Sequence, residues 1–148
     1  SEYLSVFHEL RAGSIQVDVN AEVKLIELII AAADQSLLES AHDCSVGGLA
    51  ITLAEGAVAG KIGIDCSSVD LGDRIDAACF GEAGARVVVS VIPSLVSVLT
   101  DLASDMGVNA VCLGTVGGDR IRLGTAIDIS LQDAIAAYQG AFQRAVMA

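Results

Sequence analysis

The chain has 148 residues, a formal net charge of −11 at pH 7 and a sequence pI near 4.3. This length suits one domain with a sizeable core. The acidic charge and the absence of Trp argue against nucleic acid as a partner, because binding it needs a basic field and aromatic platforms. Hydrophobic residues make up 53% of the chain, but the longest uncharged stretch, 87–100, is broken by Pro93, so we expect no membrane span. Strands buried on both faces, or an interface with another domain or subunit, account for the apolar excess.

The chain contains four cysteines, none of them in a CxxC pair. We expect reduced, mostly buried thiols in a cytoplasmic protein, and no zinc site at these spacings. The cysteines are Cys44, Cys66, Cys79 and Cys112.

The first half of the chain alternates helical and strand patterns. Asn20 is expected to cap a long helix that reaches Leu38, because apolar residues recur there at helical spacing. The other elements predicted here are a helix over Tyr3–Leu10 ended by Gly13, strands at Ser40–Asp43 and Lys61–Cys66, and helices over Ser45–Val58 and Asp73–Cys79.

The second half opens with the clearest strand, Ala85–Ile92, which is dominated by β-branched residues. A helix follows over Ser94–Met106, with Gly107 as its stop. Two strands are then expected to form a hairpin around Gly117-Gly118, and a capping box opens the last helix. These strands are Asn109–Val116 and Arg120–Gly124, and the last helix runs from the box Ser130–Asp133 to Val146. The interleaving predicts an α/β domain with a mixed β-sheet covered by helices.

The segment from His42 to Leu49 has the layout of a strand-to-helix turn. Ser45 can cap the helix, and Gly47 and Gly48 allow a ligand to approach the backbone N–H groups at the positive end of the helix. Asp43 can hold a magnesium ion that bridges to a phosphate. Two interpretations stay open on these residues alone: a turn that faces a phosphate or nucleotide, and a capped turn whose glycines serve packing.

A second glycine-rich segment, Phe80–Arg86, precedes the best strand. Glu82 and Arg86 are either a pair in a site or a surface salt bridge, and the second interpretation is favoured. The chain contains no phosphate-loop, dinucleotide-binding or serine-elbow motif, and no nucleophile and base can be paired. We therefore assign no catalytic residue.

Residues 40–55, SAHDCSVGGLAITLAE, resemble the HDxSxGGL…LAE segment of the phosphoribosylformylglycinamidine synthase (PurL) family. Four further segments resemble that family in the same order, so the resemblance covers nearly the whole chain. They are SEYL at 1–4, FGEAGARVVVSV at 80–91, LGTVGGDRIRL at 113–123 and DAIAAYQGAFQRAV at 133–146.

The resemblance implies a C-terminal domain of the AIR-synthetase (PurM) C-terminal type. Its fold would be α/β (α+β-like), a mixed β-sheet covered by helices that is partly ferredoxin-like. Residues 1–20 would lead in from a preceding domain, and 21–148 would form this domain. We therefore expect the chain to be part of a longer protein.

The family's full enzyme is an ATP-dependent C–N ligase of purine biosynthesis. It uses ATP to activate the formamide oxygen of formylglycinamide ribonucleotide, and ammonia from glutamine then displaces phosphate to give the amidine. The resemblance implies as partners the remaining synthase domains, a glutaminase and small accessory subunits, with a homo-oligomer also possible. The isolated chain is expected to be inactive.

Residue by residue, the resemblance assigns Asp43 to a Mg²⁺ site and Ser45 to a bound ATP or ADP in an auxiliary site. The remaining candidate nucleotide-binding residues are Gly47, Gly48, Glu82 and Arg86. This chain departs from the family pattern at Val46, Ala83 and Ala85, where the family commonly has Asp, Ser and Ser. Two alternatives remain: a domain of another ATP enzyme of the same superfamily, and a non-enzymatic oligomeric α/β binding module.

Overall fold

The computed structural model describes residues 1–11 and 17–147. They fold as two compact units that use alternating parts of the sequence. Unit 1 contains Ser1–Thr52 and Phe80–Cys112, and unit 2 contains Leu53–Cys79 and Leu113–Ala148. Within the described ranges, no helix is both long enough and apolar enough to cross a bilayer.

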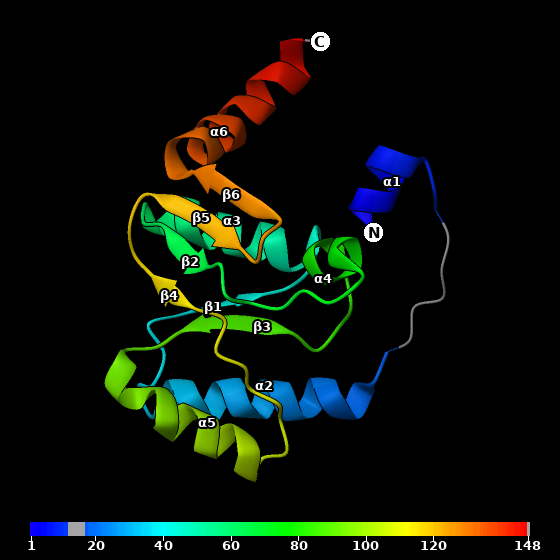
Figure 1. Ribbon diagram of the computed structural model, residues 1–148. Helices are drawn as coiled ribbons and strands as arrows, with labels where there is room; N and C mark the ends of the chain where they lie inside the picture. Colours follow the sequence, from blue (N-terminus) through cyan, green and yellow to red (C-terminus); the bar gives the residue numbers. More distant parts are fainter. Residues whose placement is uncertain (12–16, 148) are drawn as a thin grey trace. The chain divides into compact units, whose positions relative to one another are not determined.

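Helices and strands alternate along most of the chain (Figure 1). In order they are α1 (Glu2–His8), α2 (Val19–Asp34), β1 (Ser40–Asp43), α3 (Gly48–Gly60), β2 (Ile64–Cys66), α4 (Ile75–Phe80), β3 (Val87–Ser90), the 3₁₀ turn η1 (Pro93–Leu95), α5 (Val96–Asp105), β4 (Thr115–Val116), β5 (Arg120–Leu123), β6 (Ile127–Ser130) and α6 (Leu131–Met147).

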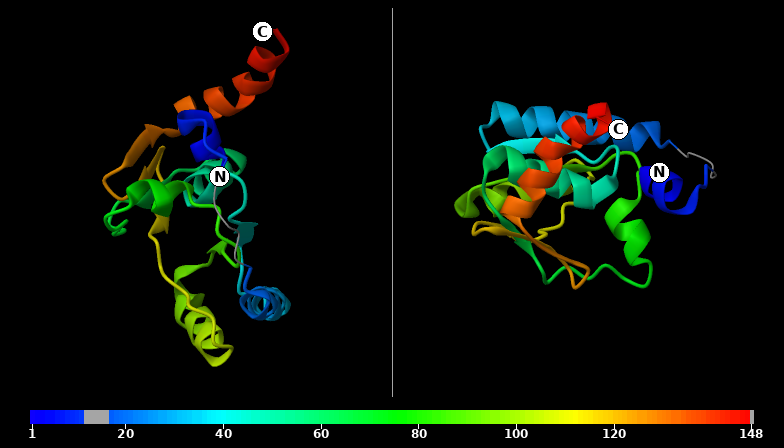
Figure 2. Two further views of the ribbon diagram at one scale, coloured as in Figure 1. Left: turned by 90° about the vertical axis from the view of Figure 1, so that its right-hand side faces the viewer. Right: turned by 90° about the horizontal axis from the view of Figure 1, so that it is seen from above.

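Unit 1 is built on an antiparallel ribbon of β1 and β3, in which Ser40 lies opposite Ser90 and Asp43 opposite Val87. Helices α2 and α5 lie side by side on one face of this ribbon (Figures 1 and 2). Val89 of β3 and Val91, which follows the strand, supply β-branched side chains to the core on that face. The core there consists of Ala32, Leu37 and Leu99, with Leu38, Val89, Val91, Leu95 and Leu102 packed around them.

The ends of α2 differ from the prediction. The helix is capped by Asp18, whose Oδ1 accepts the N–H of Ala21 at 3.0 Å, so the expected cap at Asn20 is wrong. It ends at Asp34 instead of Leu38, because Ser36 takes the left-handed conformation with φ 56°. This turn brings the buried Leu37 back over the helix, where its N–H donates to the Ala32 carbonyl at 2.9 Å.

The remaining elements of unit 1 lie close to their predicted places. Helix α1 ends at His8 and is followed by Glu9, which has φ 52°, and the expected stop at Gly13 lies outside the described residues. The predicted helix after Pro93 begins as η1 and continues as α5. Gly107, with φ 67°, follows its end as predicted.

Unit 2 contains a four-stranded sheet in the order β4-β2-β5-β6. Strands β2 and β5 run parallel and the other neighbours antiparallel, so the predicted mixed sheet is confirmed. The Ser130 half of the predicted box before α6 forms, because the Asp133 N–H donates to Ser130 Oγ at 3.0 Å, and the Ser130 hydroxyl donates to Asp133 Oδ2 at 2.6 Å. The core of this unit consists of Ala57, Ile121 and Leu131, with Ala54, Ile64, Ala134 and Ile135 around them.

The predicted hairpin of 109–116 with 120–124 is wrong. Only Thr115–Val116 of the first segment forms a strand, and β2 lies between it and β5. Gly63 makes this insertion possible, because it exchanges backbone hydrogen bonds with Gly117 at 2.7 Å and Gly118 at 2.9 Å. A Cβ at Gly63 would lie 2.5 Å from the Arg120 carbonyl oxygen. Gly117 and Gly118 therefore bond to the residue that precedes β2, and β2 lies between β4 and β5.

The thiol prediction is confirmed for three of the four cysteines. Cys44, Cys66 and Cys79 are buried, and Cys112 is exposed. Burial raises the pKa of the Cys79 thiol, with the nearby Asp76 carboxylate adding to the effect. Both effects disfavour the thiolate form of Cys79.

Candidate functional site

A cavity of about 590 Å³ lies in unit 1. Its walls come from α2, from the turn after β1 and from the loop before β3. The two segments that the sequence singles out therefore meet around one space. Its lining residues are Glu22, Leu25, Ile26, Ile29, Ile30, residues 43–46 and residues 82–87. Four predicted site residues, Asp43, Ser45, Glu82 and Arg86, are among them, and Gly47 and Gly48 follow directly in the chain.

The turn from Asp43 to Gly48 is held by the backbone. Cys44 N–H donates to the Arg86 carbonyl at 2.9 Å, which extends the β1–β3 pairing by one bond. Gly48 N–H donates to the Ser45 carbonyl at 3.1 Å, and α3 begins at Gly48 instead of the predicted Ser45. Gly47 has φ 82°, and a Cβ there would collide with the side chain of Ile51. The conformation itself thus requires glycine at this position.

Glu82 reaches the backbone of this turn. Its Oε1 accepts the N–H of Gly47 at 3.1 Å and the N–H of Glu2 at 2.7 Å. These two hydrogen bonds hold the pKa of Glu82 below its usual value, because they favour the charged carboxylate. The rings of Tyr3 and Phe80 stack, with centroids 4.8 Å apart. A carboxylate of the protein itself therefore faces the positive end of α3.

Arg86 bonds within its own loop. Its Nε donates to the Ala83 carbonyl at 3.4 Å, and its guanidinium also donates to the Gly81 carbonyl. In the part of the chain that the structure describes, Arg86 and Glu82 form no ion pair. The favoured interpretation of these two residues as a surface salt bridge is therefore wrong, because each bonds to backbone groups instead.

Asp43 presents an exposed carboxylate at the cavity, with 71% of its side-chain surface accessible. His42 lies beside it, with 3.5 Å between Nδ1 and the Asp43 Oδ1. Residues 1–11 and 17–147 hold no cluster of three or more His, Cys, Asp or Glu side chains suited to a metal ion. One carboxylate is nevertheless a donor set that Mg²⁺ accepts when phosphate oxygens and water complete its shell. Asp43 fits such a site.

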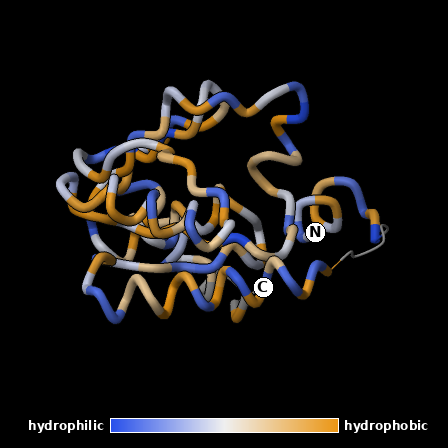
Figure 3. Tube along the Cα trace, turned by 90° about the horizontal axis from the view of Figure 1, so that it is seen from below, coloured by the Kyte–Doolittle hydropathy of each residue, from blue (hydrophilic) through white to orange (hydrophobic). Residues whose placement is uncertain are grey.

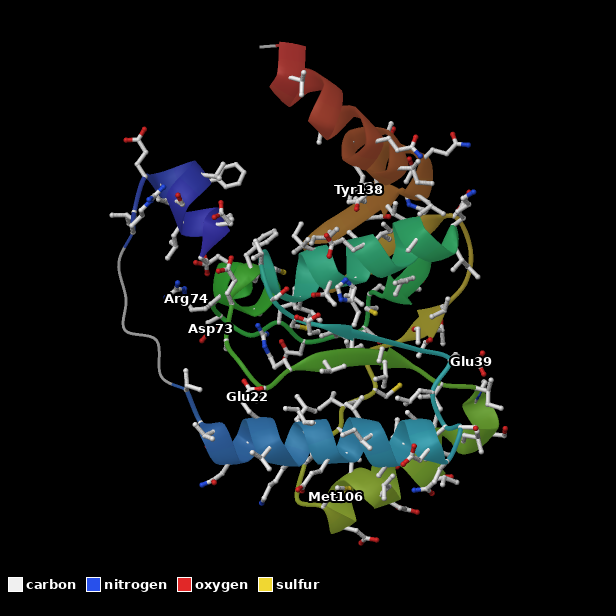
Figure 4. All side chains as sticks on the ribbon, turned by 180° about the vertical axis from the view of Figure 1, so that it is seen from behind. Glu22, Glu39, Asp73, Arg74, Met106 and Tyr138 are labelled. Carbon is white, nitrogen blue, oxygen red and sulfur yellow. The ribbon has the colours of Figure 1, made fainter. Side chains whose placement is uncertain are left out.

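The sequence analysis missed the contribution of α2 to this cavity. Glu22 points from α2 toward the loop before β3 (Figure 4), where its Oε1 accepts the N–H of Ala85 at 2.6 Å. Ala85 has φ 53°, so this bond stabilises a backbone conformation that is unfavourable for alanine. The apolar spacing of α2 places Ile26, Ile29 and Ile30 on the helix, but it does not show that they turn toward the two loops.

A family model described as AIR synthase related protein, C-terminal domain, matches residues 1–124. The chain belongs to this family. Within it, the relatives are named phosphoribosylformylglycinamidine synthase subunit PurL. The one from Thermobifida fusca is 45% identical over 124 residues, which is 83% of this chain and 16% of the relative. One from Anaeromyxobacter dehalogenans is 34% identical over 94% of this chain and 20% of its own length. The resemblance seen in the sequence is therefore confirmed.

Solved structures show the same fold. Thermotoga maritima PurL complexed with ATP superimposes with a TM-score of 0.69 at 22% identity, covering 84% of this chain and 23% of that one. The structure of PurLQS from the same organism gives a TM-score of 0.67 at 19% identity, covering 87% and 23%. The expected α/β fold is thus confirmed. The chain spans between about a sixth and a fifth of the length of these two curated relatives.

Proposed function

We propose that this chain serves as the C-terminal AIR-synthetase-type domain of a phosphoribosylformylglycinamidine synthase. The complete enzyme would be an ATP-dependent ligase that activates the formamide oxygen of formylglycinamide ribonucleotide and forms the amidine with ammonia from glutamine. The observation that carries this proposal is the 45% identity to a PurL subunit over 83% of the chain. Thermotoga maritima PurL has been solved in complexes with ATP, ADP and AMPPCP, which supports a nucleotide-using parent.

In this enzyme the chain would be a supporting domain. Residues 1–20 would lead in from a preceding domain, and the remaining synthase domains would carry the reacting groups. A glutaminase and small accessory subunits would be the other partners, in a cytoplasmic complex, and self-association is also possible. The short share of the relatives that this chain spans, 16% and 20%, supports such a division of labour.

The turn after β1 would face a magnesium nucleotide. Asp43 would supply one oxygen ligand to Mg²⁺, which neutralises phosphate charge when bound. Ser45 would contact the nucleotide, and the glycines at 47 and 48 would let it approach the backbone. Glu82 and Arg86 would act by holding the turn and the loop in place, since their polar atoms bond to Gly47, Gly81 and Ala83.

Titration calorimetry with ADP and Mg²⁺ tests this site. We expect the chain to bind Mg·ADP, and Asp43→Asn to weaken the binding about tenfold or more, because a charged ligand is lost. Without Mg²⁺ the two proteins should bind ADP equally weakly. Asp101→Asn, which changes an exposed carboxylate of α5, is the matched control. Absence of heat at millimolar Mg·ADP, or equal affinities of the original chain and Asp43→Asn, would contradict the site.

Two further experiments test whether the chain is a supporting domain of a synthase. The purified chain should not turn over formylglycinamide ribonucleotide with ATP and ammonia, and turnover would refute the supporting role. The natural reading frame upstream of Ser1 should encode several hundred further residues with ATP-site segments. A start codon directly before Ser1 would refute the proposed parent enzyme without bearing on whether the turn binds Mg·ADP.

A further inference from the structure

Helix α2 has apolar side chains on two different sides. One side is buried in unit 1 through Leu28 and Ala32. The other side carries four β-branched residues that stay exposed, here called the α2 stripe. They are Val19, Val23, Ile26 and Ile30, with 65%, 47%, 56% and 56% of their surfaces accessible. Figure 3 shows hydrophobic residues interleaved with hydrophilic ones along this helix.

The α2 stripe has the spacing of a helix–helix seam. Its members follow one another at intervals of four, three and four residues, which places them in one line along the helix. Alternation of three and four is the pattern by which one helix packs its side chains between those of another. Val and Ile have lower helix propensity than Leu or Ala, so the helix itself gains little from them. Four such residues in a line indicate a surface that is covered by a second helix.

The charges beside the α2 stripe indicate the chemistry of that helix. Glu22 and Glu27 flank the stripe on its two sides, at the positions where coiled coils place residues that select their partners. The chain as a whole carries a formal charge of −11. A second copy of α2 packed parallel along the stripe would place Glu22 of one copy opposite Glu27 of the other, and an antiparallel copy would place the two Glu22 residues on the same flank of the seam. Like charges at that place oppose self-pairing and favour a basic partner.

The carboxylates at the cavity also favour a basic partner helix. Ile26 and Ile30 belong to both the α2 stripe and the cavity wall, where Asp43 and Glu82 also lie. A lysine or arginine that extends from a helix on the stripe would therefore find carboxylates near its charged end. We propose that the α2 stripe docks an amphipathic helix of a partner protein, with apolar residues at matching spacing and Lys or Arg along both flanks. The proposal does not rest on the Mg·ADP site, although Asp43 belongs to both.

Designed peptides test the proposal on the 148-residue chain. The probe is a fluorescently labelled helical peptide with Leu at the seam positions and Lys or Arg at the flanks. One comparison peptide carries Glu at the flanks, and another keeps the basic flanks but has Ala at the seam. By fluorescence anisotropy, we expect the probe to bind at least about tenfold more tightly than either comparison peptide. Raised salt should reduce the preference for basic flanks.

Variants of the chain locate the interface. Val23→Asp should weaken probe binding about tenfold or more, because it places a charge inside the apolar seam, and Glu27→Lys should weaken it less. Val111→Asp is the matched control, since Val111 is also in unit 1 and 67% exposed but is not part of α2. All three variants should keep the circular dichroism spectrum and melting temperature of the original chain, because the changed side chains are exposed.

Three results would overturn the proposal. Equal affinities for the three peptides would show that the chain recognises neither the apolar seam nor the basic flanks of the probe. Equal loss of binding in Val111→Asp and Val23→Asp would place the binding elsewhere. A dimer in sedimentation velocity that Val23→Asp dissociates would show that a second copy of the chain covers the α2 stripe.

Discussion

The Oε1 atom of Glu82 accepts a hydrogen bond from the backbone N–H of Gly47 at 3.1 Å, over a sequence separation of 35 residues. A residue directly before a helix normally satisfies its first free N–H groups. At the start of α3, the Glu82 carboxylate from a distant loop accepts such an N–H group. Ser45, the predicted cap, accepts the N–H of Gly48 through its backbone carbonyl. The same Glu82 atom also accepts the N–H of Glu2, so one oxygen ties α1 to the start of α3.

Replacing this carboxylate should destabilise the fold. We expect Glu82→Ala to lower the free energy of unfolding by about 1–2 kcal/mol, because two backbone donors lose their acceptor. Urea denaturation followed by circular dichroism measures the change. Glu39→Ala is the control, since Glu39 is exposed and labelled in Figure 4, and it should stay within about 0.5 kcal/mol of the original chain. Equal effects of the two substitutions would show that the Glu82 bonds contribute nothing particular.

Stability should also fall in acid. Hydrogen bonds from the Ser67 side chain and backbone, and then from Arg122, lower the pKa of Asp65 from 3.8 to about 2. The unfolded chain therefore binds this proton at a higher pH than the folded one, so the stabilisation is present above pH 3.8 and is lost as the pH falls toward 2. Urea denaturation at several pH values in this range measures the slope. Asp65→Asn should make the slope shallower, and an unchanged slope would contradict the assignment.

Gly63 is expected to tolerate no side chain. A Cβ there would lie 2.5 Å from the Arg120 carbonyl oxygen and 2.7 Å from that of Gly117, both of which are backbone atoms. Gly63→Ala should therefore lower the free energy of unfolding by about 2 kcal/mol or more, or prevent folding. Gly56→Ala is the matched control within unit 2, because a Cβ there meets nothing within 4 Å. It should raise stability by about 0.5–1 kcal/mol in thermal or urea denaturation.

The start of α2 offers a comparison between two neighbouring residues. Asp18→Ala should cost about 1 kcal/mol, because the Asp18 carboxylate accepts the Ala21 N–H at 3.0 Å. Asn20→Ala should leave the stability almost unchanged, since Asn20 lies inside the helix and is exposed. Urea denaturation of the two variants decides between the caps. A larger loss for Asn20→Ala would show that the helix begins two residues later.

Local patterns predicted much of the secondary structure. The β-branched run at 87–90, the helix over 96–105 with its stop at Gly107, and the cap of the last helix by Ser130 all form as expected. Each depends on interactions within a few residues along the chain, so the sequence carries their full signal. The apolar spacing of α2 likewise predicted a helix, while its exact cap depended on which of two capping residues reached the free N–H groups.

Local sequence patterns predicted only part of the candidate site. The sequence pointed to Asp43, Ser45 and Glu82, and the structure brings all three to one cavity. It did not point to Glu22, whose bond to the Ala85 N–H spans a sequence separation of 63 residues. Helical periodicity shows which residues share a side of a helix, but it cannot show which loop that side will meet.

The sequence by itself determined the class of fold, the family resemblance and the places where the chain turns, because glycines, capping residues and apolar spacing act locally. Only the tertiary structure decided which strands pair and which donor each carboxylate binds. Two adjacent strand segments joined by glycines favour a hairpin, yet β2 takes the place between β4 and β5. Its pairing satisfies the backbone groups of both neighbours while burying Ile121 and Leu123, a gain that no stretch of sequence shows in isolation.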